Sequence, residues 1–190
     1  PAAAQLMNPD AMREFDVLVL YDMPGLDFSG VDGPLGFRDP PAALKTGFRA
    51  LLEEGKGVVA LHHALAGWPT WDDYGEWLGG RFLYQPRTVR GMNRLDSGYK
   101  HDVSYEAMVA EHPLTAGLPS HFPLTDELYL AEIFEGEVTP LLRSSASFTR
   151  DHFWSADRAI KGQMFDWGKS ARAIRQVMEK TGQYLNLLAS

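Results

Sequence analysis

Two adjacent histidines are the residues of this sequence best suited to chemistry. His62 and His63 follow residues 57–61, an apolar run typical of a strand buried on both faces. In open α/β sheets ligands bind at the carboxyl ends of the strands, so the turn that leaves this strand presents its side chains to a binding crevice. An imidazole there can act as a general base near neutral pH or bind a metal. We therefore expect one histidine to be functional and the other to be a buried, hydrogen-bonded packing residue.

Two adjacent carboxylates are the candidates to assist these histidines. Asp126 and Glu127 lie in the short apolar segment 124–130, where charges are costly unless they are paired or hydrogen-bonded. Acids are also common at the ends of strands and in loops, so the pair is a weak signal when taken alone. We predict that His62 or His63 acts as general acid or base, assisted by Glu127 or Asp126.

A bound metal ion is an alternative use of the same region. His62, His63, His112 and Asp126 offer nitrogen and oxygen ligands of the kind that Zn²⁺ accepts. Adjacent histidines reach one ion only with a favourable backbone, and a histidine before proline, as His112 is, more often belongs to a turn. The sequence leaves open whether the protein uses no cofactor or a divalent metal such as zinc.

Aromatic residues follow the histidines closely. Aromatic faces can pack on sugar rings, although packing in the core is the more common role of such residues. The aromatic group consists of Trp68, Trp71, Tyr74 and Trp77. We name five candidates for substrate binding: Asp22, Trp68, Tyr74, His112 and Tyr129.

The elements that must position these residues follow from apolar spacing. Residues 16–21 form a second apolar run, and residues 41–54 carry apolar side chains at helical spacing before Gly55, which suits a helix end. A helix between two apolar strands predicts a βαβ unit with a parallel sheet. We further expect a sharp turn and helices over residues 62–78, a strand over residues 138–142 and a helix over residues 170–188.

Composition limits the classes of protein to consider. A chain of 190 residues with 45% hydrophobic and 23% charged residues is typical of one globular domain. A net charge of −7 disfavours nucleic acid as a partner, and no apolar run approaches the ~20 residues that span a membrane. Cysteine is absent, which excludes a disulfide, a thiolate metal site and a cysteine nucleophile. We expect a cytoplasmic location, with a periplasmic or secreted one as the alternative.

Several blocks in order resemble the ThuA-like family. Residues 55–65, Gly-Lys-Gly-Val-Val-Ala-Leu-His-His-Ala-Leu, are followed by Trp68, Tyr74 and the segment 78–82. The segments 112–119 and 126–129 come later at the expected spacing, and residues 16–22 fit the preceding strand, so the resemblance covers roughly residues 12–145. The family is named for trehalose utilisation. The resemblance implies an α/β fold, a flavodoxin-like three-layer sandwich with a mostly parallel sheet, similar to class I glutamine amidotransferases.

The resemblance also places His62 where true amidotransferases carry their cysteine nucleophile. An imidazole at that position suits proton transfer or metal binding rather than thiolate attack, so no glutaminase activity is expected. The chain departs from the family pattern at both ends. It lacks the usual opening strand and the loop with glycine and histidine, and residues 161–190 hold Gly162 and Gly168 but no histidine. We expect a single ThuA-like domain over residues 1–190 that lacks its N-terminal strand.

Two classes of function remain open. The first is an enzyme of carbohydrate metabolism that acts on a sugar or keto-sugar derivative by histidine and carboxylate acid–base chemistry, as a hydrolase, lyase or isomerase. The alternative is a non-catalytic ligand-binding or interaction protein on an amidotransferase-like fold. Catalysis requires an accessible His62 or His63 with a carboxylate within ~3 Å, whereas binding alone expects both rings packed and bonded to backbone. The expected partner is a small carbohydrate-type ligand, with a homodimer as a further expectation.

Overall fold

A parallel pair of strands forms the frame for the two histidines. In the computed structural model, which describes residues 3–27, 35–146, 154–155 and 186–187, β1 (Val17–Leu20) lies parallel to β4 (Gly57–Ala60). β13 (Asn186–Leu187) lies antiparallel on the other edge of β4. The connection from β1 to β4 contains the helix α1 (Ala42–Glu53), so the predicted βαβ unit is confirmed.

The helix α1 ends where its sequence predicts. Its buried positions, which recur at helical spacing, are Leu44, Gly47, Phe48 and Leu51. Gly55 has a positive φ of 77°, a conformation that glycine adopts without strain. The N–H of Gly55 then donates to the carbonyl of Leu52, and that of Lys56 to the carbonyl of Leu51. These two bonds form a Schellman motif, which turns the chain directly into β4.

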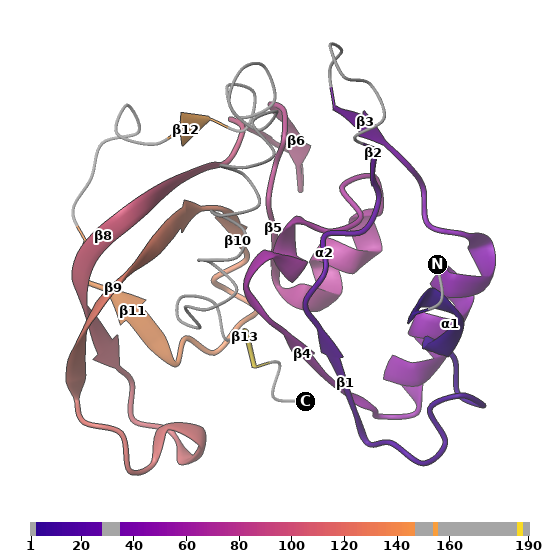
Figure 1. The fold of residues 1–190 in the computed structure, drawn as a ribbon, viewed down its shortest axis with the longest axis horizontal. Helices are drawn as coiled ribbons and strands as arrows, with labels where there is room; N and C mark the ends of the chain where they lie inside the picture. The colour runs from indigo at the N-terminus through magenta and orange to yellow at the C-terminus, as the bar shows by residue number, and fades with distance from the viewer. Residues whose placement is uncertain (1–2, 28–34, 147–153, 156–185, 188–190) are drawn as a thin grey trace.

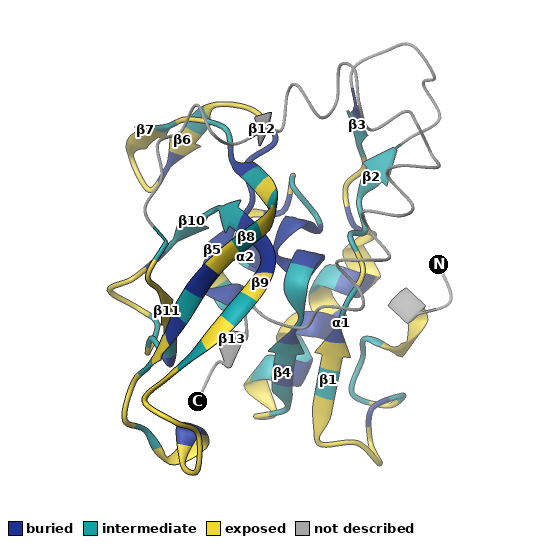
Figure 2. Ribbon diagram, turned by 60° about the vertical axis from the view of Figure 1, so that its left-hand side comes forward, coloured by how far each residue is buried: buried dark blue, intermediate teal, exposed yellow. Residues whose placement is uncertain are grey.

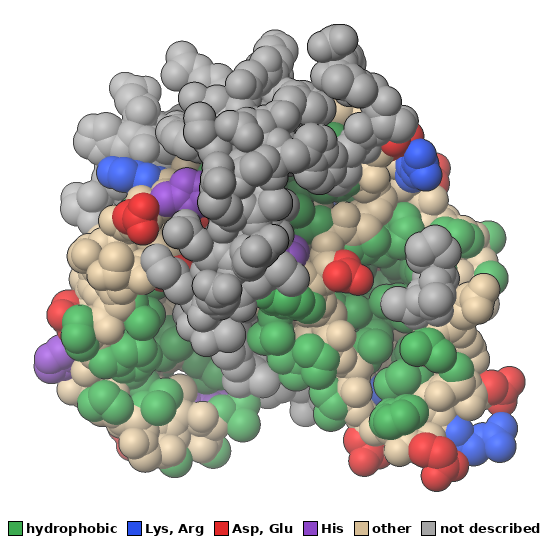
Figure 3. Space-filling view, viewed as in Figure 1, with side chains coloured by type: hydrophobic (Ala, Val, Ile, Leu, Met, Phe, Trp, Pro, Cys, Tyr) green, Lys and Arg blue, Asp and Glu red, His purple; other side chains and the backbone are tan. Residues whose placement is uncertain are grey.

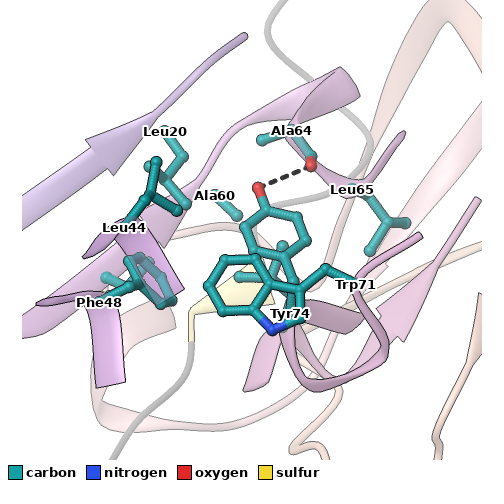
Figure 4. Close-up of a cluster of buried hydrophobic side chains, with 10 residues drawn as sticks. Leu20, Leu44, Phe48, Ala60, Ala64, Leu65, Trp71 and Tyr74 are labelled. Atoms are coloured by element: carbon teal, nitrogen blue, oxygen red, sulfur yellow. Dashed lines mark hydrogen bonds between the residues drawn. The ribbon is translucent and has the colours of Figure 1, made fainter. Parts of the chain in front are cut away.

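The hydrophobic core lies between the strand pair and the helices. Side chains of β1, β4, α1, the 3-10 helix η2 (His62–Ala66) and α2 (Asp72–Leu78) meet in one cluster: Leu20, Leu44, Phe48, Val58, Ala60, Ala64, Leu65, Trp71, Tyr74 and Leu78. Figure 4 shows the buried hydroxyl of Tyr74 donating to the carbonyl of Ala64, at 2.9 Å. This hydrogen bond and the burial of Ala64 and Leu65 therefore fix η2, which carries the histidines, to the core.

A long antiparallel hairpin supplies the second part of the site. β8 (Gly98–Val109) pairs with β9 (His121–Leu130), and β8 also pairs with β11 (Leu142–Ser144) and β12 (Trp154–Ser155). Figure 1 shows these strands on the left, with β1, β4 and α1 on the right. The 3-10 helix η3 (Pro113–Thr115) lies in the connection between β8 and β9.

Three short ladders complete the described pairings, and one of them, β5 with β10, joins the segment after α2 to the segment after β9. β5 (Gly80–Arg81) pairs with β10 (Glu132–Ile133), β2 (Leu26–Asp27) with β3 (Gly36–Phe37), and β6 (Arg87–Val89) with β7 (Met92–Arg94). The 3-10 helix η1 (Ala3–Leu6) precedes β1. The fold class is therefore mixed α/β with several small sheets. Every described strand pairing other than that of β1 with β4 is antiparallel, so a mostly parallel sheet is not confirmed.

Two predicted elements differ from the structure. The strand predicted over residues 138–142 is wrong, because the strand here is β11, which starts at Leu142 after Pro140. Proline cannot donate to a ladder and is disfavoured inside a strand. The helix predicted over residues 170–188 lies outside the described residues except at its end, where Asn186 and Leu187 form β13 instead.

Burial is deepest in the core around β4, α1 and α2 and continues into the strands that follow. Figure 2 shows buried residues along α2, β4 and β5 and on part of β9, whereas the connection between β8 and β9 is largely exposed. Hydrophobic side chains reach the surface over β1 and at that connection (Figure 3), among them Val17, Val19, Leu114 and Leu118. None of the helices in the described parts of the chain is both long enough and apolar enough to span a membrane.

Candidate active site

The turn after β4 holds His62 in an unusual backbone conformation. The N–H of Leu61 extends the ladder by donating to the carbonyl of Leu20 at 2.8 Å, and the N–H of Ala64 then bonds back to the carbonyl of Leu61. Between these two bonds His62 has a φ of 50°, in the left-handed region that residues other than glycine seldom adopt. Such strain costs on the order of 1–3 kcal/mol and is most often found at functional sites. The sharp turn predicted after this strand is confirmed.

The two imidazole rings are bonded to each other. Nδ1 of His62 and Nδ1 of His63 are 2.9 Å apart, and the rings lie nearly perpendicular, with an interplanar angle of 78°. Nε2 of His62, on the other side of its ring, lies 3.7 Å from Oε2 of Glu127. That distance is longer than a hydrogen bond, so this contact is electrostatic. His63, His62 and Glu127 therefore stand in a row.

Glu127 comes from the middle of β9 and is itself held by its neighbours. The hydroxyl of Tyr129 donates to Oε2 of Glu127 at 2.8 Å, and Nδ1 of His101 lies 3.4 Å from Oε1. The side chain of Glu127 is only 5% exposed, so these polar neighbours offset the cost of burying its charge. The ring of Tyr129 also meets that of His62 edge-on, at 5.1 Å between centroids.

A bulge in β8 brings His101 to this carboxylate. Lys100 pairs with Leu128 and Val103 with Asp126, so His101 and Asp102 together lie opposite Glu127. Two residues against one is the pattern of a β-bulge, which kinks the strand and redirects side chains. Asp102 takes up the extra residue with a φ of 55°.

Burial keeps both histidines neutral near neutral pH. Burial, and to a lesser extent the charge of His63, lowers the pKa of His62 from 6.5 to about 3. Burial also lowers the pKa of His63, while the negative charge of Asp22 acts in the opposite direction. The pKa of Tyr129 is raised by burial and by the charge of Glu127, so its hydroxyl remains a donor.

Asp22 reaches His63 because two loops approach closely. The N–H of Trp68 donates to the carbonyl of Pro24 at 2.7 Å. A Cβ on Gly67 would lie 2.9 Å from Cδ of Pro24, so this approach requires glycine. The segment after β1 is thereby tied to the end of η2, and Tyr21 packs its ring 5.1 Å from that of His63.

The row of groups has a preferred arrangement of protons. If Nε2 of His62 carries the proton, its N–H points at the Glu127 carboxylate and its Nδ1 accepts from Nδ1–H of His63. The opposite tautomer would point a lone pair at a carboxylate. The first arrangement leaves Nε2 of His63 unprotonated, which is the state of a general base.

The structure gathers some of the residues singled out from the sequence. His62, His63, Glu127 and Tyr129 are in contact, and Asp22 acts on His63 through its charge. Asp126 instead accepts the backbone N–H of Glu127 through Oδ1.

Three other candidates have packing or capping roles. Tyr74 is in the core, bonded to Ala64, and Trp68 packs over Gly25, where a Cβ would lie 2.8 Å from its ring. His112 caps η3, with Nδ1 accepting from the N–H of Leu114. That end of the hairpin is six residues from Glu127 along β9, roughly 20 Å at about 3.3 Å per residue.

The predicted metal set is therefore not assembled. His112 and Asp126 do not join His62 and His63, and no group of three or more His, Asp or Glu side chains within the described ranges is arranged to hold an ion. The side chains that do meet face each other instead: the imidazoles of His62 and His63 are hydrogen-bonded, and the carboxylate of Glu127 lies 3.7 Å from His62 and 3.4 Å from His101.

Sequence reasoning missed His101, Tyr21 and Tyr99. His101 reaches the site through a bulge that only the folded ladder shows, and Tyr99 stacks on Tyr129 as its register partner. Tyr21 had a usable signal, because it follows β1 at the same edge of the sheet as His62. The rule applied to the end of β4 could have been applied to β1 as well.

Comparison with known proteins gives the family. Residues 2–170 match the family model ThuA, described as trehalose utilisation. A crystal structure of a ThuA-like protein from Parabacteroides merdae is similar in fold, with a TM-score of 0.53 and 15% identity over 91% of this chain and 74% of that one. The comparison with curated proteins found no match. Since the family model spans most of the sequence, the chain belongs to the ThuA family.

Proposed function

We propose that this ThuA family protein is an enzyme of carbohydrate metabolism that moves a proton on a sugar or keto-sugar derivative. The observation that carries the proposal is the row Glu127, His62, His63, with 2.9 Å between the two Nδ1 atoms, at the carboxyl end of β4. Ligand sites of α/β sheets lie at that edge. The family description, trehalose utilisation, supports a sugar-type substrate.

His63 is the general base in this proposal. Its Nε2 takes a proton from the substrate while its Nδ1–H bonds to His62. The positive charge that develops on His63 is stabilised by Asp22, and Glu127 keeps His62 in the tautomer that accepts this bond. His62 therefore orients His63, whereas the cysteine that amidotransferases carry at this position acts as a nucleophile. The chain has no cysteine that could attack glutamine.

The non-catalytic alternative rests on burial. The side chains of His62 and Glu127 are 7% and 5% exposed, and His63, the proposed base, is itself only 7% exposed. The 3.7 Å between His62 and Glu127 also exceeds the ~3 Å set for direct assistance. However, the two imidazole rings are hydrogen-bonded to each other and lie beside Glu127. A protein that only binds its ligand is expected to have both rings hydrogen-bonded to the backbone. Distances in free enzymes often shorten when substrate binds.

A proton-exchange experiment separates the two functions. The protein is incubated in D₂O with trehalose, glucose and their keto derivatives, and ¹H NMR follows deuterium incorporation and product formation. We expect turnover by the native chain and a loss of roughly 10²-fold or more in His63→Gln, because a positioned base contributes 10²–10⁴-fold. His121→Gln, a change at an exposed histidine of β9, is the matched control. Turnover unchanged in His63→Gln would refute the mechanism, and binding without turnover in both proteins would favour the alternative.

The finer architecture is part of the proposal. A parallel pair joined through a helix, as in β1, α1 and β4, is the repeating unit of flavodoxin-like three-layer folds and supports that arrangement here. An experimental structure with helices on only one face of β1 and β4 would contradict it.

A further inference from the structure

Glu127 serves two histidines, and the proposed function uses only one of them. Oε2 faces Nε2 of His62 at 3.7 Å, and Oε1 faces Nδ1 of His101 at 3.4 Å. The side chain of His101 is 25% exposed, whereas those of His62 and Glu127 are almost fully buried. His101 is thus more exposed to solvent than the His62 and Glu127 side chains.

We propose that His101 is a positioning residue, which acts through Glu127 to fix the tautomer of His62 and so keeps Nε2 of His63 free to act as the base. This inference rests on the proposed function and adds a residue to it. His101 does not touch the reacting atoms. Its role is to direct Nδ1–H at Oε1, 3.4 Å away, and thereby hold Glu127 as a carboxylate facing His62.

The reason is the cost of burying a carboxylate. A buried carboxylate is stable only with hydrogen-bond donors or positive charges around it, and each donor lost makes the protonated form easier to populate. A protonated Glu127 could donate to Nε2 of His62. His62 would then carry its proton on Nδ1 and donate to Nδ1 of His63, across the 2.9 Å contact. His63 would in turn hold its proton on Nε2, and the base would be lost.

The fold provides this contact by a specific device. The bulge places His101 and Asp102 opposite Glu127, and Asp102 adopts a φ of 55° to make room. The ring of His101 meets that of Tyr99 edge-on, at 5.2 Å, and Tyr99 stacks on Tyr129. The hydroxyl of Tyr129 also donates to Glu127. The two oxygens of the Glu127 carboxylate are therefore contacted by one side chain from β8, His101, and one from β9, Tyr129.

The tautomers can be read directly in the full chain. Long-range ¹H–¹⁵N NMR of protein labelled with ¹⁵N-histidine distinguishes a protonated ring nitrogen from an unprotonated one, without any substrate. We expect Nε2–H on His62 and Nδ1–H on His63 in the native chain. In His101→Leu we expect the opposite tautomer of His62 to rise roughly tenfold or more, since the buried carboxylate loses a polar N–H that faces it at 3.4 Å.

Matched variants separate this role from a general loss of structure. His101→Gln retains an N–H donor of similar reach and should restore the native tautomers, whereas His101→Asn is too short and should behave like His101→Leu. His121→Leu should leave the tautomers unchanged, because His121 lies at the far end of β9. If His101→Leu does not fold, the tautomers of His62 in His101→Gln and His101→Asn still test whether the donor at this position is required.

The outcomes distinguish this inference from the proposed function. Native tautomers in both His101→Leu and His101→Asn would overturn the role of His101 and leave the base assignment standing. Nδ1–H on His62 in the native chain would overturn the base assignment itself. A shift that Gln fails to rescue would show that the ring, rather than its donor, is required, and would also overturn the role proposed here.

Discussion

His62 is neutral in the folded protein because it is buried beside another histidine. Burial and the charge of His63 lower its pKa from 6.5 to about 3, whereas the unfolded chain has an ordinary histidine. Between these two values the unfolded state binds a proton that the folded state does not. The free energy of unfolding must therefore fall as the pH drops through this range.

A substitution at His62 tests that dependence. His62→Asn removes the titrating ring, and asparagine tolerates the left-handed backbone found there. Between pH 7 and pH 4 we expect the native chain to lose on the order of a few kcal/mol more stability than the variant. Urea unfolding at successive pH values measures this, with His121→Asn as control. Parallel pH curves for native chain and His62→Asn would rule out a strongly lowered pKa.

Two tyrosines near the site give a second test at this scale. The hydroxyl of Tyr21 is buried without a hydrogen-bond partner among the described residues, whereas that of Tyr74 bonds to Ala64. Burying an unbonded hydroxyl costs about 1–3 kcal/mol, and a typical hydrogen bond contributes about 1 kcal/mol. We expect Tyr21→Phe to be neutral or stabilising and Tyr74→Phe to be destabilising by about 1 kcal/mol. Equal losses in thermal unfolding would mean that the Tyr21 hydroxyl has a partner.

At the scale of elements, the β8 bulge is the feature that the site depends on. A residue with a β-carbon at the φ of 55° found for Asp102 pays roughly 1–2 kcal/mol relative to glycine. Asp102→Gly and Asp102→Ala both remove the side chain and differ only in backbone preference. We expect the alanine variant to be less stable by about 1–2 kcal/mol, with urea unfolding as the measurement. An alanine variant as stable as the glycine variant would mean that the bulge relaxes at no cost.

Local patterns explain which elements could be predicted from the sequence. The unit β1, α1, β4 follows from apolar spacing and from Gly55, and the turn that carries His62 and His63 follows from the end of an apolar strand. These signals lie within a few residues of the features they predict. The metal set failed for the opposite reason. It assumed that His112 approaches His62, and nothing in their spacing reports that His112 caps η3 at the far end of a hairpin.

Contacts between distant segments explain what could not be predicted. Glu127 was a candidate because two acids stood in an apolar strand, but its contact with His62 depends on how the hairpin docks against η2. His101 depends on a register shift, and a register is set by pairing rather than by local sequence. The antiparallel pairing of β13 with β4 likewise joins residues more than a hundred positions apart, at Asn186 and Ala60.

At the scale of the whole molecule, the candidate site lies across the junction of two structural parts. His62 and His63 belong to the part built on β1 and β4, while Glu127, His101 and Tyr129 belong to the hairpin β8–β9 (Figure 1). Phe82 packs at that junction: its ring contacts Tyr84 and Tyr129, and its N–H donates to the carbonyl of Leu65. Packing at this junction should therefore determine whether Glu127 stays in contact with His62, and so which tautomers His62 and His63 adopt.

Two phenylalanines separate docking from stability. Phe82→Ala and Phe48→Ala each empty a buried site, and each should lower the free energy of unfolding by about 3–5 kcal/mol. Phe48 lies in the core of β1, β4 and the helices, where it contacts Trp71 and Tyr74. Only Phe82→Ala loosens the hairpin, so only that variant should change the tautomer of His62 in ¹⁵N NMR. An equal change in Phe48→Ala would mean that the contact of His62 with Glu127 depends on overall stability, and that the two parts are not coupled through this junction.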